Sequence, residues 1–267
     1  MARVLGERVA APKSYAPEVL EPIARAMGRA KLPTFDATQC FGADVWHCYE
    51  LSWLGPEGRP DSCVAILTIP SDTSQTVESK SLKLYLHSLN FKVFESRERL
   101  VATISQDLAA VLGAVPDLQL VDHNHLTSMT HKVVGRSIDT EVVRSSPSGS
   151  PSPRCAAGGE SVTEVWYSHN LRSLCPVTGQ PDWATLVLDY SGQVWEISTI
   201  ADYLLSFREH QEFHEQCVER IFSDLMACCE PAKLTVSAFY QRRGGIDITP
   251  WRSNQPLATP RWRLDRQ

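Results

Sequence analysis

The sequence predicts an α+β protein made of two similar modules in tandem, each with the order strand, strand, helix, helix, strand, strand. Three observations support this prediction. Alternating apolar residues, and apolar residues at helical spacing, follow one another in the same order in both halves of the chain. A stretch that contains only serine, proline and glycine, Ser145–Pro153, separates the halves. The halves also align with each other residue by residue, which indicates a duplication.

Composition narrows the class of protein. The chain has 267 residues, of which 43% are hydrophobic and 21% charged, as in a folded globular protein large enough for two modules. A net charge of -5 argues against a nucleic-acid binder. No apolar run approaches the roughly 20 residues that span a bilayer, and Met1–Ala11 has no apolar stretch typical of a secretory signal. We therefore expect a cytoplasmic protein whose eight cysteines are mostly free thiols.

The first half begins with an N-terminal segment over residues 1–35, in which apolar residues within Ser14–Ala30 recur at helical spacing. A module over residues 36–144 follows. Its predicted strands flank a turn rich in glycine and proline, and its predicted helices carry leucines at helical spacing. In order, the expected elements are strands at Asp44–Leu54 and Cys63–Ile69, helices at Ser79–Asn90 and Glu95–Leu112, and weaker strands at Leu118–Val121 and Lys132–Val143.

The second half begins after a linker. Residues 145–160 are rich in serine, proline and glycine and cannot bury enough apolar surface to fold, so we expect this linker to be disordered. A second module over residues 161–267 then repeats the pattern of the first. In order, its expected elements are strands at Val162–Tyr167 and Ala184–Tyr190, helices at Thr199–Arg208 and Glu212–Cys228, and strands at Leu234–Gln241 and Ile246–Ile248.

The alignment of the halves also indicates how a functional site is divided between them. Residues 59–69 match residues 180–190, and the first helix of each half shares a pattern of glutamate, tyrosine, leucine and serine. The reactive and charged positions have diverged. The divergent pairs are Cys175 against Gly55, Lys80 against Ser198 and Lys83 against Ala201. Each half keeps groups that the other lacks, so we expect a working site to need both halves.

The stretch Arg172–Trp183, between the first two strands of the second half, is the strongest candidate for chemistry. Its prolines fix the backbone, so the loop should hold one shape. Cys175 is then a candidate nucleophile, Arg172 a nearby cation that favours the thiolate, and Asp182 a group that supplies or relays a proton. The alternative is a buried and inert thiol, which is the commoner fate of a free cysteine, although proline, glycine and aspartate are poor neighbours for a core position.

Two stretches are candidate anion sites. At Glu78–Lys83 a helix begins, where Ser79 can act as the cap and the free amides of the first turn, with Lys80 and Lys83, suit a nucleotide phosphate. The alternative is a solvated, lysine-rich helix start. At Arg242–Gly245 the glycines let the backbone approach a ligand and the arginines can grip phosphate, unless the glycines only make a hairpin turn. The chain has neither a Rossmann nor a P-loop glycine pattern.

The stretch Phe213–Glu215 begins the second helix of the second half. Glu215 can accept hydrogen bonds from the N–H edge of a purine-like base, and His214 can donate to a carbonyl or shuttle a proton. The alternative is a glutamate that complements the helix dipole beside a surface histidine. No metal is expected, because a metal site needs three or four convergent ligands. The histidines with the most metal-like spacing are His123, His125 and His131.

Together these stretches resemble the bimodular NADPH-dependent 7-cyano-7-deazaguanine reductases (QueF-type nitrile reductases) of queuosine biosynthesis, in the tunnelling-fold superfamily. The matching motifs are Glu78–Tyr85, Cys175–Trp183, Phe213–Glu215 and Arg242–Gly245, and Tyr15–Ile23 is similar to the N-terminal segment of the family. The resemblance covers nearly the whole chain. It implies two tandem tunnelling-fold modules, with antiparallel sheets and with helices packed on one face of them.

The resemblance also implies a reaction, the reduction of a nitrile to an aminomethyl group at the expense of two NADPH, in a pathway of tRNA modification. Cys175 would form a covalent thioimide, and Asp182 would protonate the nitrile nitrogen, which requires that burial raise the pKa of Asp182. The implied substrate-binding residues are Val77, Glu78, Ser79, His214 and Glu215, and the implied NADPH-binding residues are Ser79, Lys80, Arg243 and Gly244. A homodimer is implied as well, with no direct contact to nucleic acid or membrane.

Two other functions stay open when only the residues are considered. A cysteine hydrolase could combine Cys175, His214 and Asp182 as a thiol, imidazole and carboxylate set. Such an enzyme would not need the two basic phosphate sites. A non-catalytic purine-binding module could keep Glu215 without needing Asp182.

Overall fold

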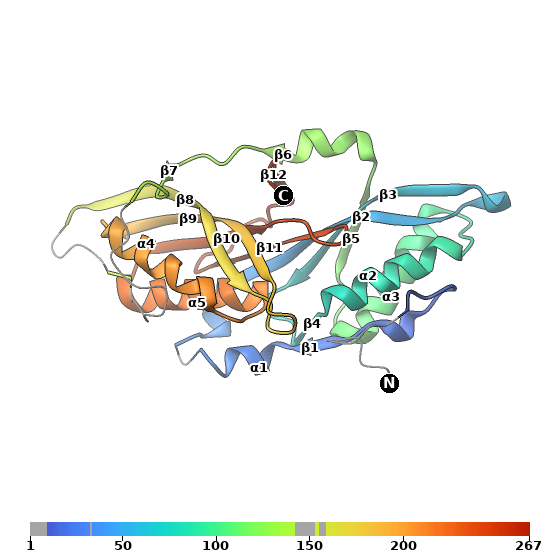
Figure 1. Ribbon diagram of the computed structural model, residues 1–267, viewed down its shortest axis with the longest axis horizontal. Helices are drawn as coiled ribbons and strands as arrows, with labels where there is room; N and C mark the ends of the chain where they lie inside the picture. Colours follow the sequence, from blue (N-terminus) through green and yellow to red (C-terminus); the bar gives the residue numbers. More distant parts are fainter. Residues whose placement is uncertain (1–9, 33, 142–152, 155–158) are drawn as a thin grey trace.

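One sheet of eight strands runs through the molecule, in the order β5-β3-β2-β11-β10-β9-β8-β7 (Figure 1). The computed structural model describes residues 10–32, 34–141, 153–154 and 159–267. Neighbouring strands are antiparallel except β7 and β8, which run parallel. The strands are β2 (Phe41–Leu54), β3 (Pro60–Pro70), β5 (Asp117–Val121), β7 (Arg136–Ser137), β8 (Ser161–Leu174), β9 (Pro181–Gln193), β10 (Lys233–Tyr240) and β11 (Ile246–Ser253).

Four helices pack on one face of this sheet (Figure 1). They are α2 (Ser79–Ser88), α3 (Arg97–Leu112), α4 (Ile197–Ser206) and α5 (His214–Cys229). Two hydrophobic cores lie between the helices and the sheet, one in each half of the chain. In the first core Tyr85 and Leu100 pack among residues of β2 and β3, and in the second Ile200 and Ile221 pack among residues of β8, β9 and β10. The predicted α+β class and the placement of helices on one face are confirmed.

The internal duplication is visible in the details of the two halves. Strands β2 and β8 both have 14 residues, α2 and α4 both have 10, and α3 and α5 both have 16. Each first hairpin has a register shift at the same depth, between Cys48 and Leu51 in one and between Ser168 and Leu171 in the other. The side chains agree as well. In each half a tyrosine of the first helix donates to an aspartate of the second at 2.6 Å, Tyr85 to Asp107 and Tyr203 to Asp224.

The last strand of the first half departs from the prediction. A strand was expected over Lys132–Val143, but among the described residues of that range only β7 is a strand, and β7 pairs with β8 of the second half. The place beside β2 is taken by β11, which pairs with β2 from Ser253 opposite Phe41 to Ile246 opposite Cys48. Both faces of β11 are buried because it lies at the centre of the sheet. The two halves therefore share one continuous sheet.

The N-terminal segment also differs from the single helix expected within Ser14–Ala30. It consists of a 3₁₀ turn η1 (Pro17–Val19), a short strand β1 (Pro22–Ala24) and a helix α1 (Arg25–Arg29). Proline lacks a backbone donor and forces the preceding residue into an extended conformation, so Pro22 interrupts the helical pattern. Strand β1 instead pairs antiparallel with β4 (Gln75–Val77), which lies directly before α2.

The remaining segments connect these elements or cover the other face of the sheet. Strand β12 (Arg263–Leu264), near the C-terminus, pairs parallel with β6 (Thr130–His131) on the side away from the helices (Figure 1). The other 3₁₀ turns are η2 (Ala37–Gln39), η3 (Pro56–Gly58), η4 (Leu89–Phe91), η5 (His123–Met129) and η6 (Phe207–Glu209). No helix in the described part of the chain is long and apolar enough to cross a membrane.

Most of the expected linker, residues 145–160, lies outside the described residues. Within the described part of it, Pro153 is buried. The backbone of Arg154 bonds to the start of α4, because its N–H donates to Thr199 Oγ1 at 3.0 Å and its carbonyl accepts from the Glu196 N–H at 3.1 Å. This end of the expected linker therefore contacts the second module.

Candidate active site

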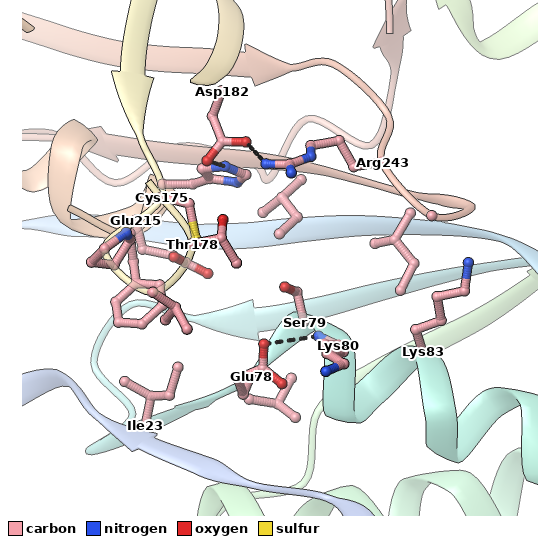
Figure 2. A pocket seen from close by; sticks show the side chains of 18 of the residues that line it. Ile23, Glu78, Ser79, Lys80, Lys83, Cys175, Thr178, Asp182, Glu215 and Arg243 are labelled. Carbon is pink, nitrogen blue, oxygen red and sulfur yellow. Dashed lines mark hydrogen bonds and ion pairs between the residues drawn. The ribbon is translucent and has the colours of Figure 1, made fainter. Parts of the chain in front are cut away.

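A cavity of about 390 Å³ lies where the two halves meet. It is lined by all ten residues that the sequence analysis assigned to the substrate, the cofactor or the chemistry. From the first half these are Val77, Glu78, Ser79 and Lys80, and from the second half Cys175, Asp182, His214, Glu215, Arg243 and Gly244. Figure 2 shows the two groups facing each other across the cavity. The proximity of these residues is a structural observation, while their individual roles stay predictions.

Cys175 lies in the loop that connects β8 to β9. The loop is closed by backbone hydrogen bonds, since the Cys175 N–H donates to the Gln180 carbonyl and the Gly179 N–H donates to the Cys175 carbonyl, both at 2.9 Å. Gly179 has φ of 66°, a conformation that favours glycine. The thiol is partly exposed, and Figure 2 shows its sulfur on the same side of the cavity as the Glu215 carboxylate. The loop thus aims a thiol into the cavity, as its prolines and glycine predicted.

Arg172 does not contribute the cation expected beside this thiol. Its guanidinium donates to the Arg208 carbonyl and lies 3.6 Å from the Glu209 carboxylate, and it does not line the cavity. Because β8 runs on to Leu174, Arg172 is within the strand and its side chain points to the segment after α4. The cation that does line the cavity in this half is Arg243.

Asp182, the second residue of β9, is buried between two basic groups. Arg243 donates to its Oδ1 atom (Figure 2), and His214 Nε2 lies 3.3 Å from its Oδ2 atom. Burial acts to raise the pKa of Asp182, but the hydrogen bond and charge of His214 and the charge of Arg243 outweigh it, so the pKa is lowered. The expectation that burial alone raises this pKa is therefore wrong for the cavity without ligand, where Asp182 is an anion at neutral pH.

His214 is held by a contact that the sequence did not reveal. It is the first residue of α5, and its ring stacks on the ring of Tyr240 with centroids 3.7 Å apart and planes at 9°. Tyr240 ends β10, opposite Ala184 of β9. The stack fixes the imidazole plane, so Nε2 stays directed at Asp182. Only the register of β9 and β10 places Tyr240 there, and no motif in the sequence indicates that register.

Four carboxylates line the cavity, and three of them have partners. Glu78 accepts from the Lys80 and Ser81 amides, and Asp182 is bound by Arg243 and His214. Glu212 is bound by Arg220 and lies 2.9 Å from His210. Glu215 is the fourth. Although it is buried, its carboxylate accepts no hydrogen bond from another described residue, and burial followed by the charge of Asp44 raises its pKa. Glu215 is therefore the carboxylate available to a ligand.

The start of α2 differs from its predicted form. The helix is capped by Glu78, whose carboxylate accepts from the Lys80 N–H at 3.0 Å and from the Ser81 N–H at 2.6 Å. The cap was expected to be Ser79, with the first-turn amides free for an anion. Glutamate reaches these amides because it lies at the N-cap with extended backbone, one residue before the helix. An anion here must rely on side chains and on the facing turn.

That facing turn is Arg243–Ile246, a two-residue hairpin between β10 and β11. Gly244 and Gly245 have φ of 59° and 82°, as a type I′ turn requires, so the glycines do make a hairpin turn. The turn also reaches the first half, because a Cβ atom on Gly244 would lie 3.0 Å from Lys83 Nζ. Arg242 points away from the cavity, with its guanidinium 4.5 Å from the centre of the Tyr49 ring.

No group of three histidine, cysteine or acidic side chains within the described residues is arranged to hold a metal ion. The fold and the cavity thus define a two-module α+β protein with a thiol, an imidazole and an unpaired carboxylate in one ligand-sized cavity. Basic side chains of both halves lie at its border.

Comparison with known proteins identifies the family. A family described as nitrile reductase, 7-cyano-7-deazaguanine-reductase N-term, matches residues 11–120, and a family described as QueF-like protein matches residues 181–258. The chain is 42% identical over 260 residues to the NADPH-dependent 7-cyano-7-deazaguanine reductase of Bordetella pertussis. The aligned region covers 96% of this chain and 94% of that enzyme. The chain is 44% identical over 259 residues to the enzyme of the same name from Stenotrophomonas maltophilia, with the same coverage.

A solved structure, that of the archaeosine synthase QueF-Like in the apo form, matches with a TM-score of 0.32 and 16% identity, covering 37% of this chain and 96% of that one. The chain belongs to the family of NADPH-dependent 7-cyano-7-deazaguanine reductases.

Proposed function

We propose that the protein is an NADPH-dependent oxidoreductase that reduces the nitrile of 7-cyano-7-deazaguanine to an aminomethyl group, a step in queuosine biosynthesis for tRNA modification. One observation carries this proposal, which is that the ten predicted residues of both halves line a single cavity. The names of relatives that match over nearly the whole chain support it. The cavity volume of about 390 Å³ is in the range of small-molecule sites.

Recognition of the base falls to the end of the cavity near α5. A 7-deazaguanine presents ring and exocyclic N–H groups on one edge, and Glu215 is the carboxylate there that no other described residue engages by a hydrogen bond. His214 lies beside it, held flat against Tyr240. Val77, Glu78 and Ser79 form the opposite wall, so the base would lie between α5 and the start of α2.

The chemistry begins at Cys175. Its thiolate attacks the nitrile carbon, a carbon–sulfur bond forms, one π bond of the nitrile opens, and the nitrogen takes up a proton to give a thioimide. The proton would come from Asp182 and His214 acting as a pair, since Asp182 alone is an anion and His214 Nε2 lies 3.3 Å from its Oδ2 atom.

NADPH, when bound, supplies the hydride for each of the two reduction steps, four electrons in all. The residues present fit a dinucleotide with phosphate groups, because Lys80 and Ser79 from α2 and Arg243 and Gly244 from the facing turn lie at the border of one cavity. The backbone at Gly244 can come close to a ligand because it carries no Cβ atom. These four residues would hold NADPH in the cavity that Cys175 also lines.

A second candidate function is supported by one observation. Cys175, His214 and Asp182 line the same cavity, and His214 contacts Asp182, as in a cysteine hydrolase. Mixing the protein with the nitrile and NADPH, and following both NADPH absorbance and released ammonia, separates the two. Oxidation of two NADPH per nitrile supports the reductase. Release of ammonia without loss of NADPH supports a hydrolase, and neither change would indicate a binding module for purine-like bases.

The protein is also proposed to form a homodimer. Strand β5 has a single neighbour, β3, within the described part of the sheet, so one edge is open to another chain. Light scattering coupled to gel filtration tests the assembly directly. A molar mass near twice the 29.8 kDa of the chain is expected, and a mass equal to that of one chain would contradict the proposal.

A further inference from the structure

The chain that connects α4 to α5 lies against the end of β8 that precedes Cys175. This α4–α5 connection consists of residues 207–213 and begins with η6. The Leu174 N–H donates to the His210 carbonyl at 2.8 Å, and Leu174 pairs with the connection as in a parallel sheet. The partner of Leu174 on β9 is Pro181, which has no backbone N–H to donate. The connection therefore helps to fix the residue directly before the thiol.

A buried ion cluster holds the α4–α5 connection in place. Glu212 is 2% exposed and accepts two hydrogen bonds from the Arg220 guanidinium, one from Nε to Oε2 at 3.0 Å and one from Nη2 to Oε1. His210 Nε2 lies 2.9 Å from the Oε2 atom of Glu212. We call these three side chains the Glu212 cluster. Because Arg220 belongs to α5, the cluster fastens the connection to the helix that follows it.

The first half of the chain has a different side chain at the position of Glu212. There the Leu54 N–H donates to the Lys92 carbonyl at 3.0 Å, which is the counterpart of the backbone bond described above. Two residues further on, Phe94 takes the place of Glu212 and is buried in the first core. A buried ion pair is often no more stable than apolar side chains of the same volume, because both charges lose their water. Stability alone therefore does not account for the charges in the second half.

Glu212 lines the cavity, but it is not suited to donate a proton there. Burial acts to raise the pKa of Glu212, but the hydrogen bonds and charges of His210 and Arg220 outweigh it and lower the pKa to about 2. The carboxylate is therefore an anion at neutral pH. What Glu212 contributes to the site is a fixed position for the chain on which it lies.

We propose that Glu212 is a positioning residue for the chemical step, which keeps the α4–α5 connection against the end of β8 and thereby aligns the Cys175 thiol with the nitrile carbon. The proposal rests on the function proposed above. Glu212 acts through the His210 side chain and then through the bond from the Leu174 N–H to the His210 carbonyl. A small displacement of a reacting group, of about 1 Å, can lower a rate about 10²-fold.

Loss of the Glu212 cluster should lower the rate of adduct formation and leave the affinity for the nitrile unchanged. His214 and Glu215, which are proposed to bind the base, belong to α5 itself. The His214 ring also stacks on Tyr240, with centroids 3.7 Å apart. These contacts do not involve the cluster. Recognition of the base therefore stays in place, and only the approach of the thiol changes.

The test replaces both charges of the ion pair by apolar side chains of similar volume, in the full-length double variant Glu212→Leu, Arg220→Met. With saturating 7-cyano-7-deazaguanine and no NADPH, we expect this variant to form the adduct about 10²-fold more slowly than the parent in stopped-flow absorbance. Its melting temperature should equal or exceed that of the parent. Calorimetry in a Cys175→Ala background should give an unchanged dissociation constant for the nitrile.

Phe94→Leu is the matched control, because it alters the equivalent buried position of the first half. It should lower the melting temperature and leave the rate of adduct formation unchanged. Glu212→Asp is a second test variant, which decides if the double variant fails to fold. It keeps the charge but draws the carboxylate back from Arg220, so it should also slow adduct formation without a change in affinity.

Three outcomes would overturn the proposal alone. These are a parental rate of adduct formation in the test variants, a loss of affinity, which would make Glu212 a binding residue, and an equal fall in rate in Phe94→Leu, which would indicate a general loss of stability. A parent protein that forms no adduct at all would instead refute the proposed function together with this inference. The two failures are therefore distinguishable.

Discussion

Arg243 and Asp182 form an ion pair inside the cavity, in which the guanidinium donates to the Oδ1 atom of the carboxylate and also to the Gln180 side chain. The same arginine is proposed to bind NADPH, and the same aspartate to take part in proton transfer. Each proposed role uses a group that is already engaged in the Arg243–Asp182 ion pair. Binding of a phosphate by Arg243 would weaken its hold on Asp182 and make that carboxylate more basic.

Replacing Arg243 by glutamine should therefore change the pH dependence of thioimide formation as well as the affinity for NADPH. Burial raises the pKa of Asp182 while His214 and Arg243 lower it, so loss of Arg243 raises it. Adduct formation consumes a proton that Asp182 is proposed to supply, so its rate falls as pH rises and Asp182 loses that proton. In Arg243→Gln this fall should occur at higher pH, measured by stopped-flow absorbance with nitrile alone.

Arg242→Gln is the matched control for that experiment. It removes a neighbouring arginine whose guanidinium lies over Tyr49, outside the cavity. An unchanged profile in Arg243→Gln, or the same shift in both variants, would show that Arg243 does not control the proton on Asp182.

Cys175 should gain the mass of the nitrile when the protein is mixed with 7-cyano-7-deazaguanine without NADPH. The reason is that the β8–β9 loop presents this partly exposed thiol to the cavity that Asp182 and His214 also line. Intact mass and peptide mapping locate the adduct. Cys175→Ala should bind the nitrile and oxidise no NADPH, whereas Cys228→Ala, which removes an exposed thiol outside the cavity, should react normally. An adduct on any other cysteine contradicts the assignment.

Asp182→Asn should bind the nitrile but form the thioimide about 10²- to 10⁴-fold more slowly, which is the usual contribution of a positioned general acid. The amide can still lie between Arg243 and His214, but it can no longer share a proton with His214. Single-turnover absorbance measures the rate, and calorimetry in the Cys175→Ala background measures the affinity. If affinity drops while the rate at saturation stays the same, Asp182 is a binding residue.

The two halves, produced as separate chains of residues 1–144 and 161–267, should each be inactive and should recover nitrile reduction when mixed. Neither half alone has the cavity, since the first lacks Cys175 and Glu215 and the second lacks Ser79 and Lys80. Association would restore the pairing of β2 with β11. NADPH oxidation is the measurement, with the intact chain as reference. Full activity from the second half alone would show that the cavity of the intact chain is not the site.

Much of the fold follows from the sequence, for physical reasons that differ between elements. The helices α2 and α3 were predicted within two residues at each end, because leucines at helical spacing can pack on only one face. The prediction of a strand over Lys132–Val143 was wrong because strand pairing, unlike helix formation, does not depend on a local pattern. Strand pairing is a long-range choice, and β11, buried on both faces, is the strand that pairs with β2. Nothing local to either segment indicates that exchange.

The site shows the same division. Residue types at fixed spacing within one loop or one helix turn indicated Cys175 and Asp182, and the family resemblance of the same motifs implied the other residues that line the cavity. Contacts between elements were not predictable. The stack of Tyr240 on His214, the ion pair that lowers the pKa of Asp182, and the Glu78 cap each depend on strand register or on competition between side chains. The sequence indicates neither the strand register nor the outcome of this competition. The predicted protonation state of Asp182 was therefore wrong, although its location in the cavity was right.

The pairing of β11 with β2 has a consequence for how the cavity behaves on dilution. When complementary parts of a site lie on separate chains, the fraction of assembled sites depends on protein concentration. Here the two halves belong to one chain, so they meet by an intramolecular step. The effective concentration of one half around the other depends on the chain that connects them and on the shared sheet, not on protein concentration. The cavity that the halves line together should therefore stay assembled at any cellular abundance, and a cell can keep this protein scarce without losing activity per molecule.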